Sequence, residues 1–167
     1  MVYLGQEVTP PMIVSTIKKL WNSPSFLISI TLVQAILAMA GSLYFSEVEL
    51  YAPCVLCWYQ RIAIYPQAFL MAMALFQKDI KVYLYALPLL FAGTVVALYH
   101  NWIYYNSNFF HPGGPAITCS ANGGPSCTER YLEYFGFVSI PLMSLAALII
   151  MIVCMLRLRA ISKRNEA

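Results

Sequence analysis

Charged side chains are scarce in this chain. Its 167 residues include ten Lys or Arg and seven Asp or Glu, which together make up 10%, whereas a soluble domain carries roughly a quarter. A soluble chain of this length has too little interior to bury a composition that is 60% hydrophobic, and disordered chains are poor in apolar residues. The net charge of +3 is too small and too dispersed for a nucleic-acid-binding surface, so no nucleic-acid partner is expected. The composition predicts an integral membrane protein in contact with membrane lipids.

The sequence contains long apolar runs with almost no charged residues. A helix needs roughly 20 apolar residues to cross about 30 Å of hydrocarbon. Four stretches are long enough: about 26–46, 57–77, 82–105 and 137–156. The second contains one charged residue, Arg61, and the other three contain none. These runs predict an all-α membrane protein, a four-transmembrane-helix bundle over residues 26–156.

Lys and Arg are unevenly distributed between the two sides of this bundle. Eight lie on one side: Lys18, Lys19, Lys78, Lys81, Arg157, Arg159, Lys163 and Arg164. The loops on the other side, 47–56 and 106–136, hold only Arg130. Because the cytoplasmic flanks of membrane helices carry the excess of positive charge, we expect a multi-pass protein with both termini in the cytoplasm and both loops outside.

The two terminal segments lie outside the predicted bundle. In residues 1–25, apolar side chains recur at roughly helical spacing with lysines between them. This pattern is compatible with a short amphipathic helix on the cytoplasmic membrane surface, and a frayed tail explains it as well. Residues 157–167 form a basic cytoplasmic tail. Ala38-Met39-Ala40 has the form of a signal-peptidase site, but 25 residues before the apolar run are long for a signal peptide, so we predict a retained helix.

Five cysteines are the second informative feature. Cys54 and Cys57 lie where the first outer loop meets the second span, and Cys119 and Cys127 lie in the other outer loop. Cys154, deep in the fourth span, is expected to be a small packed side chain. For the loop pair, a structural disulfide explains the spacing as well as a redox role does. For the CxxC pair, a structural disulfide is a poor explanation, because a bridge across two residues removes little chain entropy and tends to be labile.

Two close cysteine pairs could also hold zinc. Structural zinc requires a compact, closed set of ligands. Here one pair lies at a helix end and the other in a loop rich in Gly and Pro. We therefore expect no metal site.

A redox role has a physical basis at the CxxC pair. Cys57 lies near a helix N-terminus, where free N–H groups stabilise an anion, and Arg61 follows on the same helix face. Both would lower the pKa of the Cys57 thiol. A charged residue inside a span is costly and usually functional, although snorkelling to lipid headgroups is the alternative. Arg61 could donate hydrogen bonds to a carbonyl of a quinone, which would accept the two electrons that a dithiol releases.

These motifs resemble a known family. The segment Cys54-Val-Leu-Cys57-Trp-Tyr-Gln60-Arg61 resembles the active-site segment of the disulfide-bond formation protein B family (DsbB), and the run from Cys127 to Pro141 is similar to that family's entry into its fourth helix. Only seven residues separate Cys119 from Cys127, which is closest to the BdbC-type branch.

The resemblance implies a dithiol:quinone oxidoreductase of the bacterial cytoplasmic (inner) membrane that supports disulfide formation in secreted proteins. A DsbA-like secreted or membrane-tethered thioredoxin-fold partner would pass electrons to Cys119 and Cys127, then to Cys54 and Cys57, and finally to ubiquinone or menaquinone. In this scheme, Cys119 forms the mixed disulfide with the partner, and Cys127 exchanges with Cys54. Cys57 faces the quinone beside the quinone-binding residues, which are Arg61, Gln60 and His100.

Two other functions remain alternatives. A vitamin-K-epoxide-reductase-like enzyme also joins a CxxC to a quinone, but there we would expect the CxxC near the end of a late helix, and here it comes first. A non-enzymatic tetraspan protein with a disulfide-stapled loop gives no reason for the CxxC pair or for Arg61.

Overall fold

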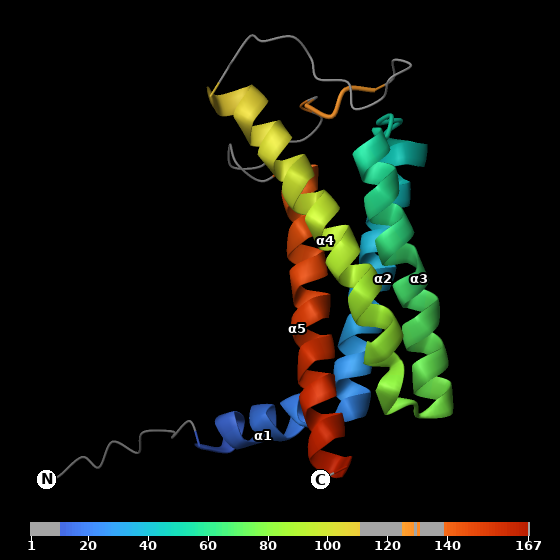
Figure 1. The fold of residues 1–167 in the computed structure, drawn as a ribbon, viewed down its shortest axis with the longest axis vertical. Coiled ribbons are helices and arrows are strands. Elements are labelled where there is room, and N and C mark those ends of the chain that lie inside the picture. The colour runs from blue at the N-terminus through green and yellow to red at the C-terminus, as the bar shows by residue number, and fades with distance from the viewer. Residues whose placement is uncertain (1–10, 111–124, 129, 131–138, 167) are drawn as a thin grey trace, which may run out of the picture.

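The computed structural model describes residues 11–110, 125–128, 130 and 139–166. Its main helices are α1 (Pro11–Trp21), α2 (Pro24–Leu43), α3 (Val55–Gln77), α4 (Tyr83–Tyr105) and α5 (Ile140–Glu166). Three short helical turns extend them: η1 (Tyr44–Val48), η2 (Ile80–Val82) and η3 (Asn106–Phe110). The helices α2 to α5 run lengthwise beside one another, and α1 leaves the bundle at one end (Figure 1).

Each predicted apolar stretch forms a helix, and most helix ends lie within a few residues of the expected bounds. Three of them, Pro24–Val48, Ile80–Phe110 and Ile140–Asn165, are long and apolar enough to cross a membrane. The helix α3 has 23 residues, but Gln60, Arg61 and Gln67 lie in it, and these polar side chains lower its mean hydropathy. The all-helical membrane architecture is confirmed at this level.

Some helix ends differ from the prediction. The last helix continues through the basic segment to Glu166, because no Gly or Pro after Pro141 interrupts it. The first long helix starts with Pro24 in its first turn, after Ser23. It continues into the π-helical turn η1 instead of stopping at Ser46. Of the two alternatives for the segment near the N-terminus, the structure has the helix over Pro11–Trp21, which is α1 and carries exposed Ile17, Lys18, Lys19 and Leu20.

The interior of the bundle is apolar. The largest fully buried side chains include Leu27, Met71, Leu90, Leu148 and Met151, one or more from each of the four long helices. Cys154 is also buried there, 1% exposed, as a packed side chain. The helices α3 and α4 approach closely at Gly93, where an added Cβ would lie 2.5 Å from Cβ of Ala63. Small residues permit such close contact between membrane helices.

The two ends of the bundle differ in chemistry. At the basic end, a tight turn joins α3 to α4, with Lys78 in the left-handed conformation (φ 54°) and Asp79 Oδ1 accepting from the Lys81 backbone N–H at 2.8 Å. The helix α1 and the C-terminal part of α5 lie at this end (Figure 1). The opposite end, where α3 begins and α4 ends, holds Cys54, Cys57 and Cys127, and we call it the cysteine end.

Candidate active site at the cysteine end

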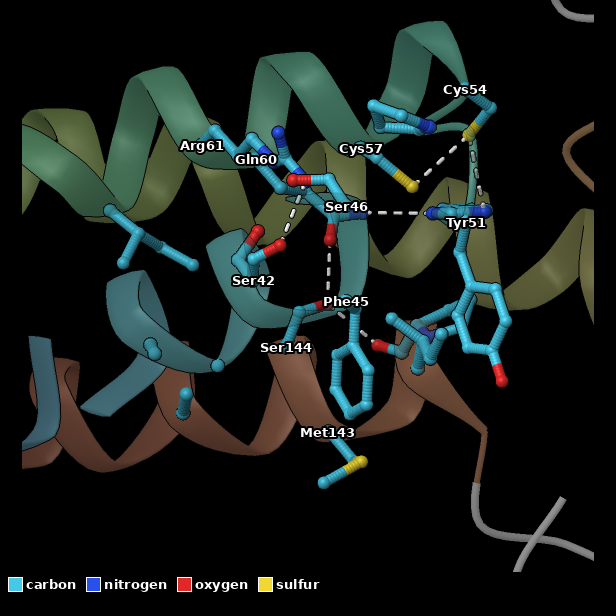
Figure 2. Close-up of a pocket in the computed structure, with 18 of the residues that line it drawn as sticks. Ser42, Phe45, Ser46, Tyr51, Cys54, Cys57, Gln60, Arg61, Met143 and Ser144 are labelled. Carbon is cyan, nitrogen blue, oxygen red and sulfur yellow. Dashed lines mark hydrogen bonds between the residues drawn. The ribbon is translucent and has the colours of Figure 1, made fainter. Parts of the chain in front are cut away.

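The CxxC pair forms the first turn of α3. Cys54 is the N-cap residue in extended conformation, and Cys57 lies in the first helical turn. This places their Sγ atoms 3.2 Å apart, with both thiols free (Figure 2). Cys54 is 3% exposed, although it lies at the end of the bundle.

His100 lies beside this pair. It comes from the last turns of α4 and is 2% exposed. Its Nε2 lies 3.8 Å from Cys54 Sγ and 3.3 Å from the backbone oxygen of Cys127. Cys54 and His100 are 46 positions apart in the sequence, so only the packing of α3 against α4 brings them together.

Cys127 completes the cluster. Its Sγ, Cys54 Sγ and a ring nitrogen of His100 all lie within 4.8 Å of one another. Cys127 is in a disulfide, so its sulfur is not a thiolate ligand for a metal in this state. Sulfurs this close are instead suited to thiol–disulfide exchange, in which a thiolate attacks a neighbouring disulfide sulfur. Cys119 lies outside the described residues.

A chain of polar contacts fixes the orientation of His100. Ser144 Oγ on α5 donates to Gln60 Oε1 at 2.6 Å, and Gln60 Nε2 lies 3.0 Å from His100 Nδ1. An amide nitrogen only donates, so in this arrangement Nδ1 accepts and the ring proton is on Nε2, facing Cys54. Cys54, His100 and Gln60 therefore form a line of contacts in which a nucleophile lies beside a histidine that a third residue orients. Many enzymes activate a nucleophile with this arrangement.

This environment favours the thiolate at Cys54. The hydrogen bond with Cys57 and, secondarily, the nearby His100 lower the pKa of the Cys54 thiol to about 4, although burial acts in the opposite direction. We expected the activated thiol to be Cys57. The structure instead favours Cys54, because its neighbours include a histidine from another helix, which sequence spacing on α3 does not reveal.

Arg61 is buried, 9% exposed, one turn below Cys57. Its Nη2 donates to the Ser42 backbone oxygen at 3.0 Å, and its guanidinium lies 5.1 Å from the centre of the Trp58 ring. Its Nε has no hydrogen-bond partner among the described residues. The side chain therefore does not snorkel to the surface, and it retains a donor for a ligand.

A cavity of about 330 Å³ adjoins the CxxC pair. It lies between α2, α3 and α5, and Cys57, Gln60, Arg61 and Ser144 line it together with mainly apolar side chains (Figure 2). Gly41 also lines it, and nothing lies within 4 Å of a Cβ built there. This volume is within the range of small-molecule sites. Its lining, apolar with a few polar groups, fits a lipid-soluble ring that carries carbonyl groups.

The segment that carries Cys127 is anchored to the end of α4. Asn108 in η3 donates from Nδ2 to the Thr128 backbone oxygen at 3.1 Å. Arg130 donates from Nε to Asn108 Oδ1 at 2.9 Å and from Nη2 to the Asn108 backbone oxygen at 2.8 Å. Sequence reasoning missed Asn108, and also Ser144. A signal for the first was that Arg130 is the only basic residue of the two predicted outer loops.

The fold and the site define a class. A helical membrane protein with a CxxC dithiol, a histidine beside its buried first cysteine and a disulfide-bonded cysteine in exchange distance is a membrane thiol–disulfide oxidoreductase. The family model described as "Disulfide bond formation protein DsbB" matches residues 24–158. The chain belongs to the DsbB family, and it is an integral membrane protein of disulfide formation.

Individual relatives agree with this assignment. A probable disulfide formation protein of Oceanobacillus iheyensis is 44% identical over 146 residues, which cover 85% of this chain and 95% of the relative. Disulfide bond formation protein C of Bacillus subtilis is 40% identical over 127 residues, covering 76% and 88%. A probable disulfide formation protein C of Halalkalibacterium halodurans is 40% identical over 122 residues, covering 73% and 85%. No solved structure matches the chain.

Proposed function

We propose that the protein reoxidises a reduced, DsbA-like thioredoxin-fold partner outside the cytoplasm and passes the electrons to a membrane quinone. The observation that carries this proposal is the position of the CxxC pair. Cys54 lies within exchange distance of Cys127 on one side, and Cys57 lines the cavity on the other. The pair therefore connects a loop disulfide with a site for a lipid-soluble acceptor.

Each step balances in electrons and protons. The partner dithiol reduces a disulfide between Cys119 and Cys127, with Cys119 forming the mixed disulfide, and the loop thiols then reduce a Cys54–Cys57 disulfide by attack of Cys127 on Cys54. The Cys54–Cys57 dithiol would then give two electrons and two protons to a quinone, ubiquinone or menaquinone, which would be released as quinol.

The buried polar residues have distinct roles in this scheme. His100, held by Gln60, donates to the Cys54 thiolate and stabilises it as it forms or leaves a disulfide. Arg61 donates to a carbonyl oxygen of the head group, and the apolar walls of the cavity exclude water. The unpartnered Nε of Arg61 supports this fit, because a buried donor without a partner is costly unless a ligand supplies one.

The proposal also includes the topology. All four long helices would cross a bacterial cytoplasmic membrane, so α3 would be a span in addition to the three longer apolar helices. The cysteine end would face outward and both termini would face the cytoplasm. The concentration of Lys and Arg at the basic end supports this orientation.

Turnover by the purified full-length protein tests the proposed function. A reduced thioredoxin-fold protein is mixed with a short-chain ubiquinone or menaquinone, and quinone reduction is followed by absorbance. We expect turnover with at least one quinone, loss to background in Cys57→Ser, and full activity in Cys154→Ala, a matched cysteine control in the core of α5. Failure of the wild-type protein with both quinones, or normal turnover by Cys57→Ser, would contradict the proposal.

A further inference from the structure

Tyr65 is a partly buried residue of the cavity that the relay leaves without a role. It lies on α3 one turn beyond Arg61, lines the same cavity, and its ring packs against the apolar core of the bundle. Its hydroxyl is buried and has no hydrogen-bond partner among the described residues. A buried hydroxyl costs free energy unless it is hydrogen-bonded, so this position calls for a polar ligand group.

The placement of Tyr65 relative to Arg61 is informative. Residues four apart share one face of a helix, and helical side chains lean toward the N-terminus of their helix. Arg61 and Tyr65 both line the cavity. Two side chains of α3 thus bring an unpartnered donor each, Arg61 Nε and the Tyr65 hydroxyl, to one mainly apolar cavity.

A quinone head group has two carbonyl oxygens on opposite sides of its ring, and both are acceptors only. We propose that Tyr65 is a quinone-binding residue whose hydroxyl donates to one carbonyl oxygen while Arg61 donates to the other. This inference rests on the proposed function and specifies the polar groups that recognise the acceptor.

Equilibrium binding to the full-length protein tests this role independently of turnover. A short-chain quinone is titrated into the protein in detergent, and quenching of tryptophan fluorescence reports the dissociation constant. Tyr65→Phe removes only the hydroxyl, and we expect it to weaken binding roughly tenfold, as the loss of one buried hydrogen bond does. Tyr59→Phe is the matched control, because Tyr59 is on the same helix, 53% exposed, and outside the cavity lining.

A second ligand separates hydrogen bonding from packing. In a ring analogue with methyl groups in place of both carbonyl oxygens, no acceptor remains for Tyr65. Wild type and Tyr65→Phe should then bind equally, so that the tenfold difference appears only with the quinone. If the Phe variant does not fold, Tyr65→Met removes the hydroxyl with a side chain that adapts to the gap.

The outcomes distinguish the two proposals. Equal quinone binding by wild type and Tyr65→Phe, or equal weakening for both ligands, would overturn the role of Tyr65 and leave the relay intact. Absence of quinone binding by the wild-type protein would overturn the proposed function and the role of Tyr65 with it. The Tyr65→Phe variant should still oxidise one equivalent of the thioredoxin-fold partner in the absence of quinone. This result would show that the substitution affects quinone binding and not disulfide exchange.

Discussion

The close contact between α3 and α4 at Gly93 predicts that a larger residue at this position destabilises the protein. In Gly93→Ala, the new Cβ would lie 2.5 Å from Cβ of Ala63 and 3.3 Å from Cδ2 of Leu148. Carbon atoms prefer separations of about 3.5–4.0 Å, so the contact with Ala63 is short by about 1 Å. Ala63 has no rotamer to change, and the two helices must therefore separate.

Overpacking of this kind costs about 1–3 kcal/mol, and each kcal/mol lowers the melting temperature of a domain this size by about 2–4 °C. Gly93→Ala should therefore melt roughly 2–12 °C lower, measured by thermal unfolding in detergent. The same displacement would lengthen the 3.0 Å contact between Gln60 and His100, which joins these two helices nearer the cysteine end. Disulfide exchange with the partner should slow as well.

Two variants control this experiment. Gly41→Ala is the same change in α2, at a position with open space around the new Cβ, so it should melt at or slightly above the wild-type temperature. Adding Ala63→Gly to Gly93→Ala removes the opposing methyl group and should restore much of the lost stability. The reasoning is refuted if Gly93→Ala melts with the wild type, or if the second change gives no recovery.

Three further predictions concern the site. Ser144→Ala removes the donor to Gln60 Oε1; a hydrogen bond contributes about 1 kcal/mol, so oxidation of the partner by the purified protein should slow about fivefold. Asn108→Ala releases the Cys127 segment from η3 and should slow exchange between the loop and Cys54 in rapid-quench trapping of mixed disulfides; an unchanged rate would show that the anchor is dispensable. A thiolate is present above its pKa and lost as pH falls through it. Because the pKa of the Cys54 thiol is lowered, ultraviolet absorbance of the reduced protein should show a thiolate at pH values below the range near 8.5 where ordinary thiols titrate. Cys54→Ser should abolish this absorbance.

The fold was predictable from the sequence to within a few residues at most helix ends. Apolar run length determines where a membrane helix forms, and Pro24 marked the start of α2. The end of α5 was not predictable from hydropathy, because the helix continues ten residues beyond the apolar run, where no Gly or Pro interrupts it. Hydropathy finds the part of a helix that lipid would cover, whereas backbone propensity determines where it ends.

The site was predictable where its residues are neighbours on one helix. The positions of Cys54, Cys57 and Arg61 on the first turns of α3 follow from spacing alone. The contacts of His100 and Ser144 join α4 and α5 to α3, and no local pattern reveals which side chains meet across helices. Which thiol lies beside the histidine depends on those contacts, which explains why spacing on α3 pointed to Cys57 and not to Cys54.

The burial of Cys54 has a consequence for the redox chemistry of the whole protein. With 3% of its surface exposed and Cys127 packed beside it, its sulfur is kinetically insulated from small thiols and oxidants in the surrounding solution. We therefore expect the Cys54 sulfur to exchange with the protein's own disulfide in preference to the redox buffer of the surroundings. Bulky maleimides should therefore leave Cys54 unlabelled in the folded protein and modify it on denaturation, as mass spectrometry of the labelled peptide would report.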